Sequence, residues 1–300
     1  MNLSPILAAL NNGSSCCRPC SLRKLEIKEK KVPQFNKCLV VIDPAHSDHL
    51  AMDRIVNVAS QDREEPIGIH LFIGFESDNK SDSNTPWQAV IGDEWVRELQ
   101  APLSATGANF VSELFWTTDW QRSIMDVANR SGVDLILISD ASAEHMKGGI
   151  TESRLVLLRE SEMPVEIVRL GAKAARDSIL AAVNIQSSDP RNEELNRKVL
   201  EKGQEIAETY GAKFHVVNAY KDSEDFPDLS YVQRIVDIPR ENLHRDMGKP
   251  ADVIVEVAEK VKADLVILGT KARKGLRATL RGNTVELVLE NLSVDVLMLH

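Results

Sequence analysis

The sequence contains no apolar run long enough to cross a membrane. A spanning helix needs about 18 or more consecutive apolar residues, whereas the runs here, such as Leu135 to Ile138, have the length of strands. The opening ten residues hold a short apolar stretch without a basic residue before it, so a secretory leader is not expected. We expect a soluble, cytoplasmic protein.

An excess of positive charge is also missing. The chain has 300 residues with 36 Lys and Arg against 45 Asp and Glu, a net charge of −9. Such a balance repels nucleic acid and anionic membrane surfaces. We therefore expect neither as a partner, and any affinity for phosphate has to come from a local basic segment.

Cysteine and histidine are too few and too scattered to indicate a metal site. Of four cysteines, Cys16, Cys17 and Cys20 lie in a polar tail over residues 1–35, which we expect to be disordered, and Cys38 lies in a predicted strand. No second Cys or His pair follows Cys17 and Cys20 at zinc-finger spacing. The seven histidines show no ligand spacing, so surface and helix-end positions are expected for them.

The sequence also lacks a catalytic signature. Ser47-Asp48-His49 contains the residue types of a hydrolase triad, but adjacent residues cannot line up nucleophile, base and orienting acid. His244-Arg245-Asp246 resembles a kinase catalytic loop without its downstream partners, and we interpret it as a strand that leads to Gly248. We expect no catalytic residue, no metal and no enzymatic activity.

What is present is a repeat of strands and helices. Residues 132–138 and 262–268 match, with Asp134 and Asp264 at the same point of a Gly/Lys-x-Asp-apolar pattern. The apolar runs 38–43 and 179–184 open the two halves as buried strands. Helical patterns precede the matched strands, and each half closes with a helix and a strand, at 151–160 and 165–168 and at 284–291 and 294–299.

Strands that alternate with helices predict an α/β fold of two tandem, doubly wound parallel-sheet domains. We place the domains at residues 36–171 and 177–300, with a linker over 171–176, and expect a helix over 193–210 that Gly211 ends. The tryptophans Trp87, Trp95, Trp116 and Trp120 all lie in the first half. They favour core or domain-interface packing over a hydrophobic ligand pocket.

The segment from Leu268 to Thr284 runs from a buried strand into a helix, which is where ligands bind in such sheets. Gly269 and Gly282 would let the main chain approach an anion, and Asn283 or Thr284 can cap the helix or donate to an oxygen. Five basic residues, Lys271, Arg273, Lys274, Arg277 and Arg281, add positive potential there. An anion site and a merely solvated glycine turn are both consistent with this pattern.

The same segment resembles the motif of the universal stress proteins, which is Gly, two residues, Gly, nine residues, then Gly-Ser or Gly-Thr. Gly269 and Gly282 occupy the first and third glycine positions, whereas Ala272 and Asn283 depart from the pattern and Thr284 follows one place late. Together with the chain length, the form is most like the tandem UspE type. The resemblance implies an adenine nucleotide alpha hydrolase-like fold, with two domains packed face to face as an internal pseudo-dimer.

In family members that bind ATP, an acid after the first strand faces the nucleoside and the motif holds the phosphates. The first half keeps that acid as Asp43, but it has Asp140 and Glu144 where the phosphate loop should be, so we expect no nucleotide there. The second half has Asn184 at the acid's position. The resemblance thus implies ATP or a related nucleotide in the second half, with these candidate residues: Asn184, Gly269, Thr270, Arg273, Gly282, Asn283 and Thr284.

Two other functions stay open. The departures at Asn184 and Ala272 favour an interaction scaffold with vestigial pockets and protein partners that the sequence does not name. A nucleotide hydrolase would need a base or a pair of metal-binding carboxylates between Gly269 and Thr284, and the sequence shows none there. Self-association is a further expectation.

Overall fold

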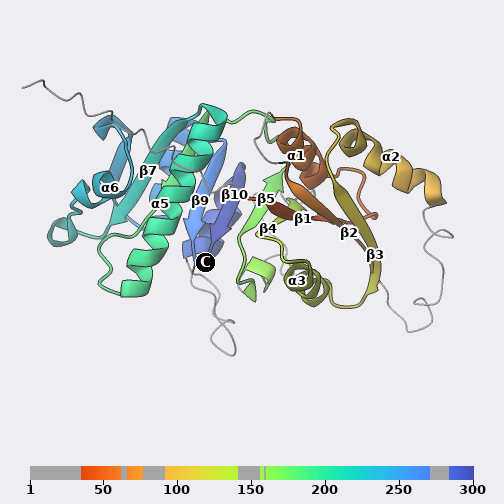
Figure 1. Ribbon diagram of the computed structural model, residues 1–300. Helices are drawn as coiled ribbons and strands as arrows, with labels where there is room; N and C mark the ends of the chain where they lie inside the picture. Colours follow the sequence, from red (N-terminus) through yellow and green to blue (C-terminus); the bar gives the residue numbers. More distant parts are fainter. Residues whose placement is uncertain (1–34, 62–65, 77–91, 141–155, 159, 271–283) are drawn as a thin grey trace, which may run out of the picture. The chain divides into compact units, whose positions relative to one another are not determined.

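The computed structural model describes residues 35–61, 66–76, 92–140, 156–158, 160–270 and 284–300 (Figure 1). These residues fall within one compact unit, Pro33–His300. The predicted tail therefore lies almost wholly outside the described residues.

The first half contains five parallel strands in the order β3-β2-β1-β4-β5. Its elements are β1 (Lys37–Ile42), α1 (Leu50–Ala59), β2 (Gly68–Glu76), α2 (Gly92–Ala105), β3 (Phe110–Thr117), α3 (Trp120–Ser131), β4 (Leu135–Asp140) and β5 (Val165–Arg169). The helix predicted over 151–160 is described only at residues 156–158 and 160. The strands are continuous apolar runs because helices cover both faces of a parallel sheet.

The second half repeats this order as β8-β7-β6-β9-β10. Its elements are β6 (Ser178–Ala182), α5 (Pro190–Tyr210), β7 (Lys213–Tyr220), η4 (Ser223–Asp225), α6 (Ser230–Ile235), η5 (Arg240–Asn242), β8 (Leu243–Met247), α7 (Pro250–Val261), β9 (Leu265–Gly269), α8 (Thr284–Asn291) and β10 (Asp295–Leu299). The helix predicted over 193–210 is α5, and it begins earlier than expected. Asp189 caps it by accepting from the Arg191 N–H, and Pro190 suits its first turn. Gly211 ends it in the left-handed conformation, as predicted.

The two halves join edge to edge. Strand β10 pairs with β5 in antiparallel register, with Val296 opposite Ile167 and Leu297 opposite Glu166, so one ten-stranded sheet runs through the described residues. The expected face-to-face contact between the domains was therefore wrong. Edge pairing satisfies the backbone groups of two strands that would otherwise be exposed sheet edges.

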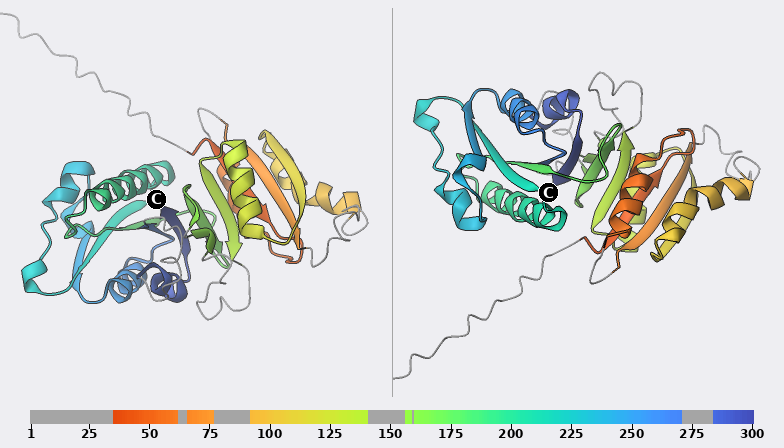
Figure 2. Two further views of the ribbon diagram at one scale, coloured as in Figure 1. Left: turned by 90° about the horizontal axis from the view of Figure 1, so that it is seen from below. Right: turned by 90° about the horizontal axis from the view of Figure 1, so that it is seen from above.

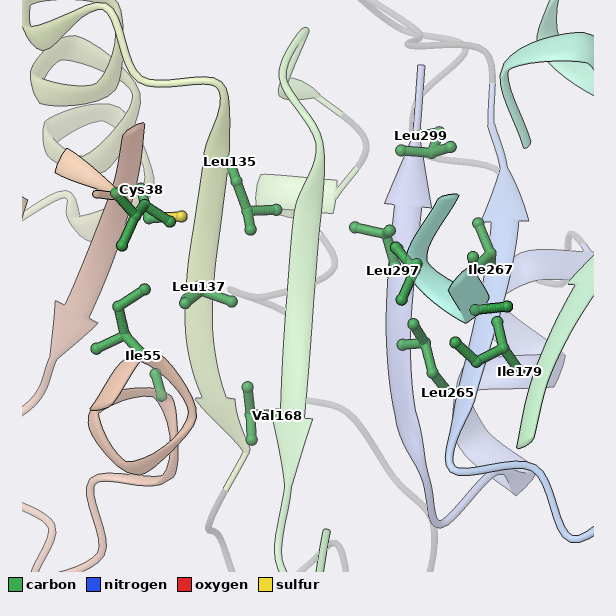
Figure 3. Close-up of a cluster of buried hydrophobic side chains, with 14 of the residues drawn as sticks. Cys38, Ile55, Leu135, Leu137, Val168, Ile179, Leu265, Ile267, Leu297 and Leu299 are labelled. Atoms are coloured by element: carbon green, nitrogen blue, oxygen red, sulfur yellow. The ribbon is translucent and has the colours of Figure 1, made fainter. Parts of the chain in front are cut away.

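Two apolar layers cover the sheet. Helices α1 and α3 lie on opposite faces of the first half's sheet, and α5 lies opposite α7 and α8 in the second half (Figure 2). One layer contains side chains from both halves, including Cys38, Ile55, Leu137, Ile179 and Leu297 (Figure 3).

Three of the four tryptophans pack as predicted against this core. Trp120 meets Phe72 edge to face, Trp116 lies 5.0 Å from the Phe75 ring, and Trp95 also contacts the core. Trp87 lies outside the described residues.

The repeated aspartates hold the start of each half's first strand. Asp134 accepts from the backbone N–H groups of Asn36 and Lys37 at 2.8 and 3.0 Å. Asp264 accepts from those of Asp177 and Ser178 at 2.8 and 3.1 Å. The sequence match thus marks a duplicated contact that fixes the opening strand against the helix and strand that carry the aspartate.

A buried ionic network lies where the halves meet. Arg54 of α1 donates to Asp295 of β10 at 2.7 Å, and the Arg169 backbone N–H donates to the same carboxylate at 2.9 Å. Arg176, from the predicted linker, donates to Glu166 and to Asp295. All five residues are at most 4% exposed. Arg176 is therefore part of the interior although most of the linker is exposed, and the irregular sequence did not indicate this.

Candidate functional site

The second half contains a cavity of about 840 Å³ at the carboxyl ends of its strands. Its walls come from the ends of β6, β7 and β9, from α5, and from the first turns of α7 and α8 (labelled in part in Figure 1). The volume falls in the range typical of small-molecule sites, and the position is the one where open α/β sheets bind ligands. Among the candidate residues, the cavity lining includes Asn184, Gly269, Thr270 and Thr284.

Asn184 is held at the cavity wall by its main chain. Its N–H donates to the Asn196 side chain at 3.1 Å, and its carbonyl accepts from Asn196 and Asn192 at 2.8 and 2.6 Å. The Asn184 residue itself is exposed at the cavity. A neutral amide therefore stands at this position, and it can both donate to and accept from a ligand.

Gly269 packs closely against Leu195 of its own domain. A Cβ placed on Gly269 would lie 2.7 Å from the Leu195 Cγ of α5. Its φ is not in the positive region either. Packing against Leu195 is thus a second reason for a glycine here, and the residue also lines the cavity, so the approach of an anion to its main chain stays a prediction.

The backbone N–H of Thr270 is not free to bind an anion. Its N–H donates to the Leu299 carbonyl at 2.8 Å, which extends the pairing of β9 with β10. This amide is therefore already used. The candidates Arg273, Gly282 and Asn283, together with Ala272 and the other basic residues of the segment, lie outside the described residues.

Two lysines that the sequence analysis did not single out also line the cavity. Lys221 follows β7 and Lys249 precedes α7, and they are the only charged residues in the described part of the lining. Pro250 starts α7, and among the described residues no side chain caps this helix. The Lys249-Pro250 pair is a helix-start signal directly after a strand, so it could have been found from the sequence. Cationic charge without a carboxylate suits an anionic ligand.

At the equivalent end of the first half, described side chains contact neighbouring groups of the same half. Ser139 accepts from the Ala51 N–H, in the first turn of α1, at 2.9 Å. Asp140 is fully buried and lies 3.8 Å from Arg169. Asp43 accepts from the Ala45 N–H at 2.9 Å and lies 3.5 Å from the His46 ring. The charge expected from Asp140 is thus compensated internally, and Glu144 lies outside the described residues.

The histidines include one pair that spacing did not predict. His215 of β7 is 9% exposed, and its Nδ1 lies 3.1 Å from Nε2 of His244 on β8. Burial, with smaller effects of His244 and Lys213, lowers the pKa of His215 to about 4. The strand over His244 was predicted correctly, whereas the surface position expected for His215 was wrong.

Two further features concern the described residues alone. The described residues bring together no group of three or more His, Cys, Asp or Glu that could hold a metal ion. Within the same ranges, every helix is too short or too polar to cross a bilayer.

The chain is similar in sequence and in fold to proteins of one family. Residues 233–300 match the model of the Universal stress protein family. The chain is 26% identical to Universal stress protein E homolog of Haemophilus influenzae, covering 88% of this chain and 97% of that protein. It is also 26% identical to Universal stress protein E of Escherichia coli K12, over 88% and 94%. A crystal structure of a putative universal stress protein from Pseudomonas aeruginosa aligns with a TM-score of 0.71 and 24% identity, over 88% and 93%.

Proposed function

We propose that this chain, a tandem, UspE-like member of the universal stress protein family, binds ATP or a related nucleotide in the cavity of its second half. The observation that carries the proposal is the cavity of about 840 Å³ whose charged lining, within the described residues, consists of Lys221 and Lys249. A phosphate chain would gain from both cations and from the start of α7. Asn184, which lines the cavity, would hydrogen-bond the nucleoside.

The basic segment that follows Gly269 and Thr270 supports the same function. Arg273, Gly282 and Asn283 connect β9, which lines the cavity, to α8, whose first residue Thr284 also lines it. Both ends of this segment are therefore at the cavity. We propose that the protein acts by binding, as a cytoplasmic protein without catalytic or metal-binding residues of its own.

A scaffold without nucleotide is the second candidate. It is favoured by the contacts at the first two motif positions, since Leu195 fills the space beside Gly269 and Leu299 takes the Thr270 N–H. In that case the family architecture would serve protein partners or self-association.

Calorimetric titration of the full chain with ATP and AMP separates these functions, together with thermal unfolding. A nucleotide that binds the folded state raises the melting temperature by mass action. The double variant Lys221→Gln/Lys249→Gln should weaken ATP binding about tenfold or more, and AMP binding less, because AMP carries fewer phosphates. The matched control is Lys213→Gln/Lys260→Gln, which removes two exposed lysines of the same half away from the cavity.

Each outcome decides between the candidates. Binding of ATP that the cavity variant weakens and the control does not supports the nucleotide site. No heat and no thermal shift with either nucleotide would refute it and leave the scaffold. Release of phosphate during the titration would overturn the proposal that the protein is not an enzyme.

A further inference from the structure

Exposed apolar side chains gather beside the cavity, at the ends of β7 and β8. Phe226 is 53% exposed and Met247 is 66% exposed, which makes them two of the most exposed large apolar side chains in the described part of the chain. Both are neighbours of cavity-lining residues: Met247 precedes Gly248, and Phe226 contacts Tyr220. Large exposed apolar groups that gather beside a cavity indicate a binding surface.

The geometry of this group is that of an aromatic platform. Tyr220 and Met247 stand opposite each other in the parallel register of β7 and β8. The Phe226 ring lies 5.4 Å from the Tyr220 ring, at an interplanar angle of 77°. The Arg245 guanidinium lies 4.4 Å from the centre of the Phe226 ring. We call these four residues the platform: Tyr220, Phe226, Arg245 and Met247. Tyr220 lines the cavity, and Phe226 contacts Tyr220 without being part of the lining.

The platform offers aromatic rings to a ligand, whereas the charged side chains of the cavity lining are lysines. Aromatic rings flanked by arginine stack planar heterocycles such as nucleobases, with little preference for the base. Lys221 and Lys249 lie directly beside the platform in the chain, next to Tyr220 and Gly248, and both line the cavity. Cationic side chains therefore lie between the cavity and a planar ring bound on the platform. A chain of phosphates that joins the two would be attracted to these cations.

We propose that the natural ligand is a dinucleotide, in which a phosphate chain joins two nucleosides. One nucleoside lies in the cavity, the phosphates pass Lys221 and Lys249, and the second base stacks on the platform at Phe226. This inference rests on the proposed nucleotide function and extends it, because a mononucleotide would leave the platform in water.

The test is calorimetric titration of the full chain with two probes that carry four phosphates each. Diadenosine tetraphosphate has a second nucleoside, whereas adenosine tetraphosphate has none. The wild-type chain should bind the first about tenfold more tightly, the gain expected of one base stacked on an aromatic side chain. Phe226→Ala should remove this preference while binding adenosine tetraphosphate as before.

Two further variants make the result specific. Phe226→Trp keeps a ring and should keep the preference for diadenosine tetraphosphate. Val111→Ala, which shortens another exposed apolar side chain on β3 of the first half, should also leave the preference unchanged. Thermal unfolding of each variant checks that the fold is retained.

The outcomes separate this inference from the function on which it rests. Equal affinities of the wild-type chain for the two probes, or a preference that survives in Phe226→Ala, would overturn the platform while the nucleotide site stands. Failure of both probes to bind would overturn both proposals.

Discussion

The carboxylate of Asp295, in the last strand of the second half, accepts a hydrogen bond at 2.7 Å from Arg54, in the first helix of the first half. Asp295 is fully buried. Burial and the nearby Glu166 raise the pKa of this carboxyl group, and Arg176 and Arg54 oppose that effect. The ionised form therefore depends on arginines from the first half and from the linker, so folding of the second half's edge is tied to the first half.

Asp295→Asn should destabilise the whole unit. The substitution leaves Arg54 and Arg176 buried beside Glu166 with one carboxylate too few, and breaking a buried ion pair in this way costs about 3 to 5 kcal/mol. Urea unfolding followed by circular dichroism measures the change in the free energy of unfolding. Asp126→Asn is the control, since Asp126 is exposed and its ion pair with the exposed Arg122 has a long distance of 4.0 Å. Equal stabilities for the two variants would contradict a structural role for the network.

Gly269→Ala should destabilise the second half through a clash with Leu195. The new Cβ would lie 2.7 Å from the Leu195 Cγ, and forcing extra carbon into a packed site costs about 1 to 3 kcal/mol. In a Leu195→Ala background the same substitution should cost clearly less. A double-mutant cycle by chemical unfolding measures this coupling. Additive effects would show that Gly269 serves something other than packing against Leu195.

The duplicated aspartates should respond differently to the same substitution. Asp264 uses one oxygen, Oδ2, for both strand N–H groups, whereas Asp134 uses Oδ2 for Asn36 and Oδ1 for Lys37. Because asparagine has only one acceptor oxygen, Asp134→Asn should lose one bond, at about 1 to 3 kcal/mol. Asp264→Asn keeps both bonds and loses the ion pair of Oδ1 with the exposed Lys173, which costs about 1 kcal/mol or less, so it should lose less. Unfolding free energies of the two variants test this. The reverse order would rule out the pairing as the source of their stability.

Stability should decrease as the pH falls through the range between about 6.5 and 4. His215 has a pKa of about 4 in the folded chain against 6.5 as the ordinary value, because burial disfavours its charged form. In that window the unfolded state binds a proton that the folded state does not, so His215 destabilises the fold progressively and the effect levels off below pH 4. The loss is on the order of 2 kcal/mol.

The His215→Leu variant isolates this contribution. Its free energy of unfolding, measured at intervals from pH 7.5 to 4.5, should fall less steeply than that of the wild-type chain. His300, whose pKa burial also lowers to about 4, is present in both chains and cancels in the difference. Parallel profiles would mean that His215 is not held in its neutral form by folding.

The secondary structure was largely predictable because its signals are local. The apolar runs that predicted strands became β1, β4, β5, β6, β9 and β10, and the closing helix over 284–291 has the predicted bounds. Periodicity and capping depend only on neighbouring residues, so a single sequence carries them. Of the candidate site residues, Asn184, Gly269, Thr270 and Thr284 do line one cavity, since the ends of parallel strands meet at the same edge of a sheet.

Contacts between distant residues were not predictable in this way. Leu195 packs closely on Gly269, and the Leu299 carbonyl accepts from the Thr270 N–H, yet neither partner is near its contact in the chain. Lys221 reaches the cavity from the end of β7, and Lys249 reaches it from the start of α7. Only Lys249 had a usable local signal, because Pro250 follows it.

The sequence alone determined the α/β class, the duplication and the edge of the sheet at which a ligand would bind, because these follow from local periodicity and the geometry of parallel strands. The tertiary structure decided how the halves meet and which charges surround the cavity. The antiparallel pairing of β5 with β10 buries Arg54, Arg176 and Asp295 together, from positions far apart in the chain. A sequence pattern predicts that such charged side chains lie on the surface. Only the folded chain buries them and pairs them with one another.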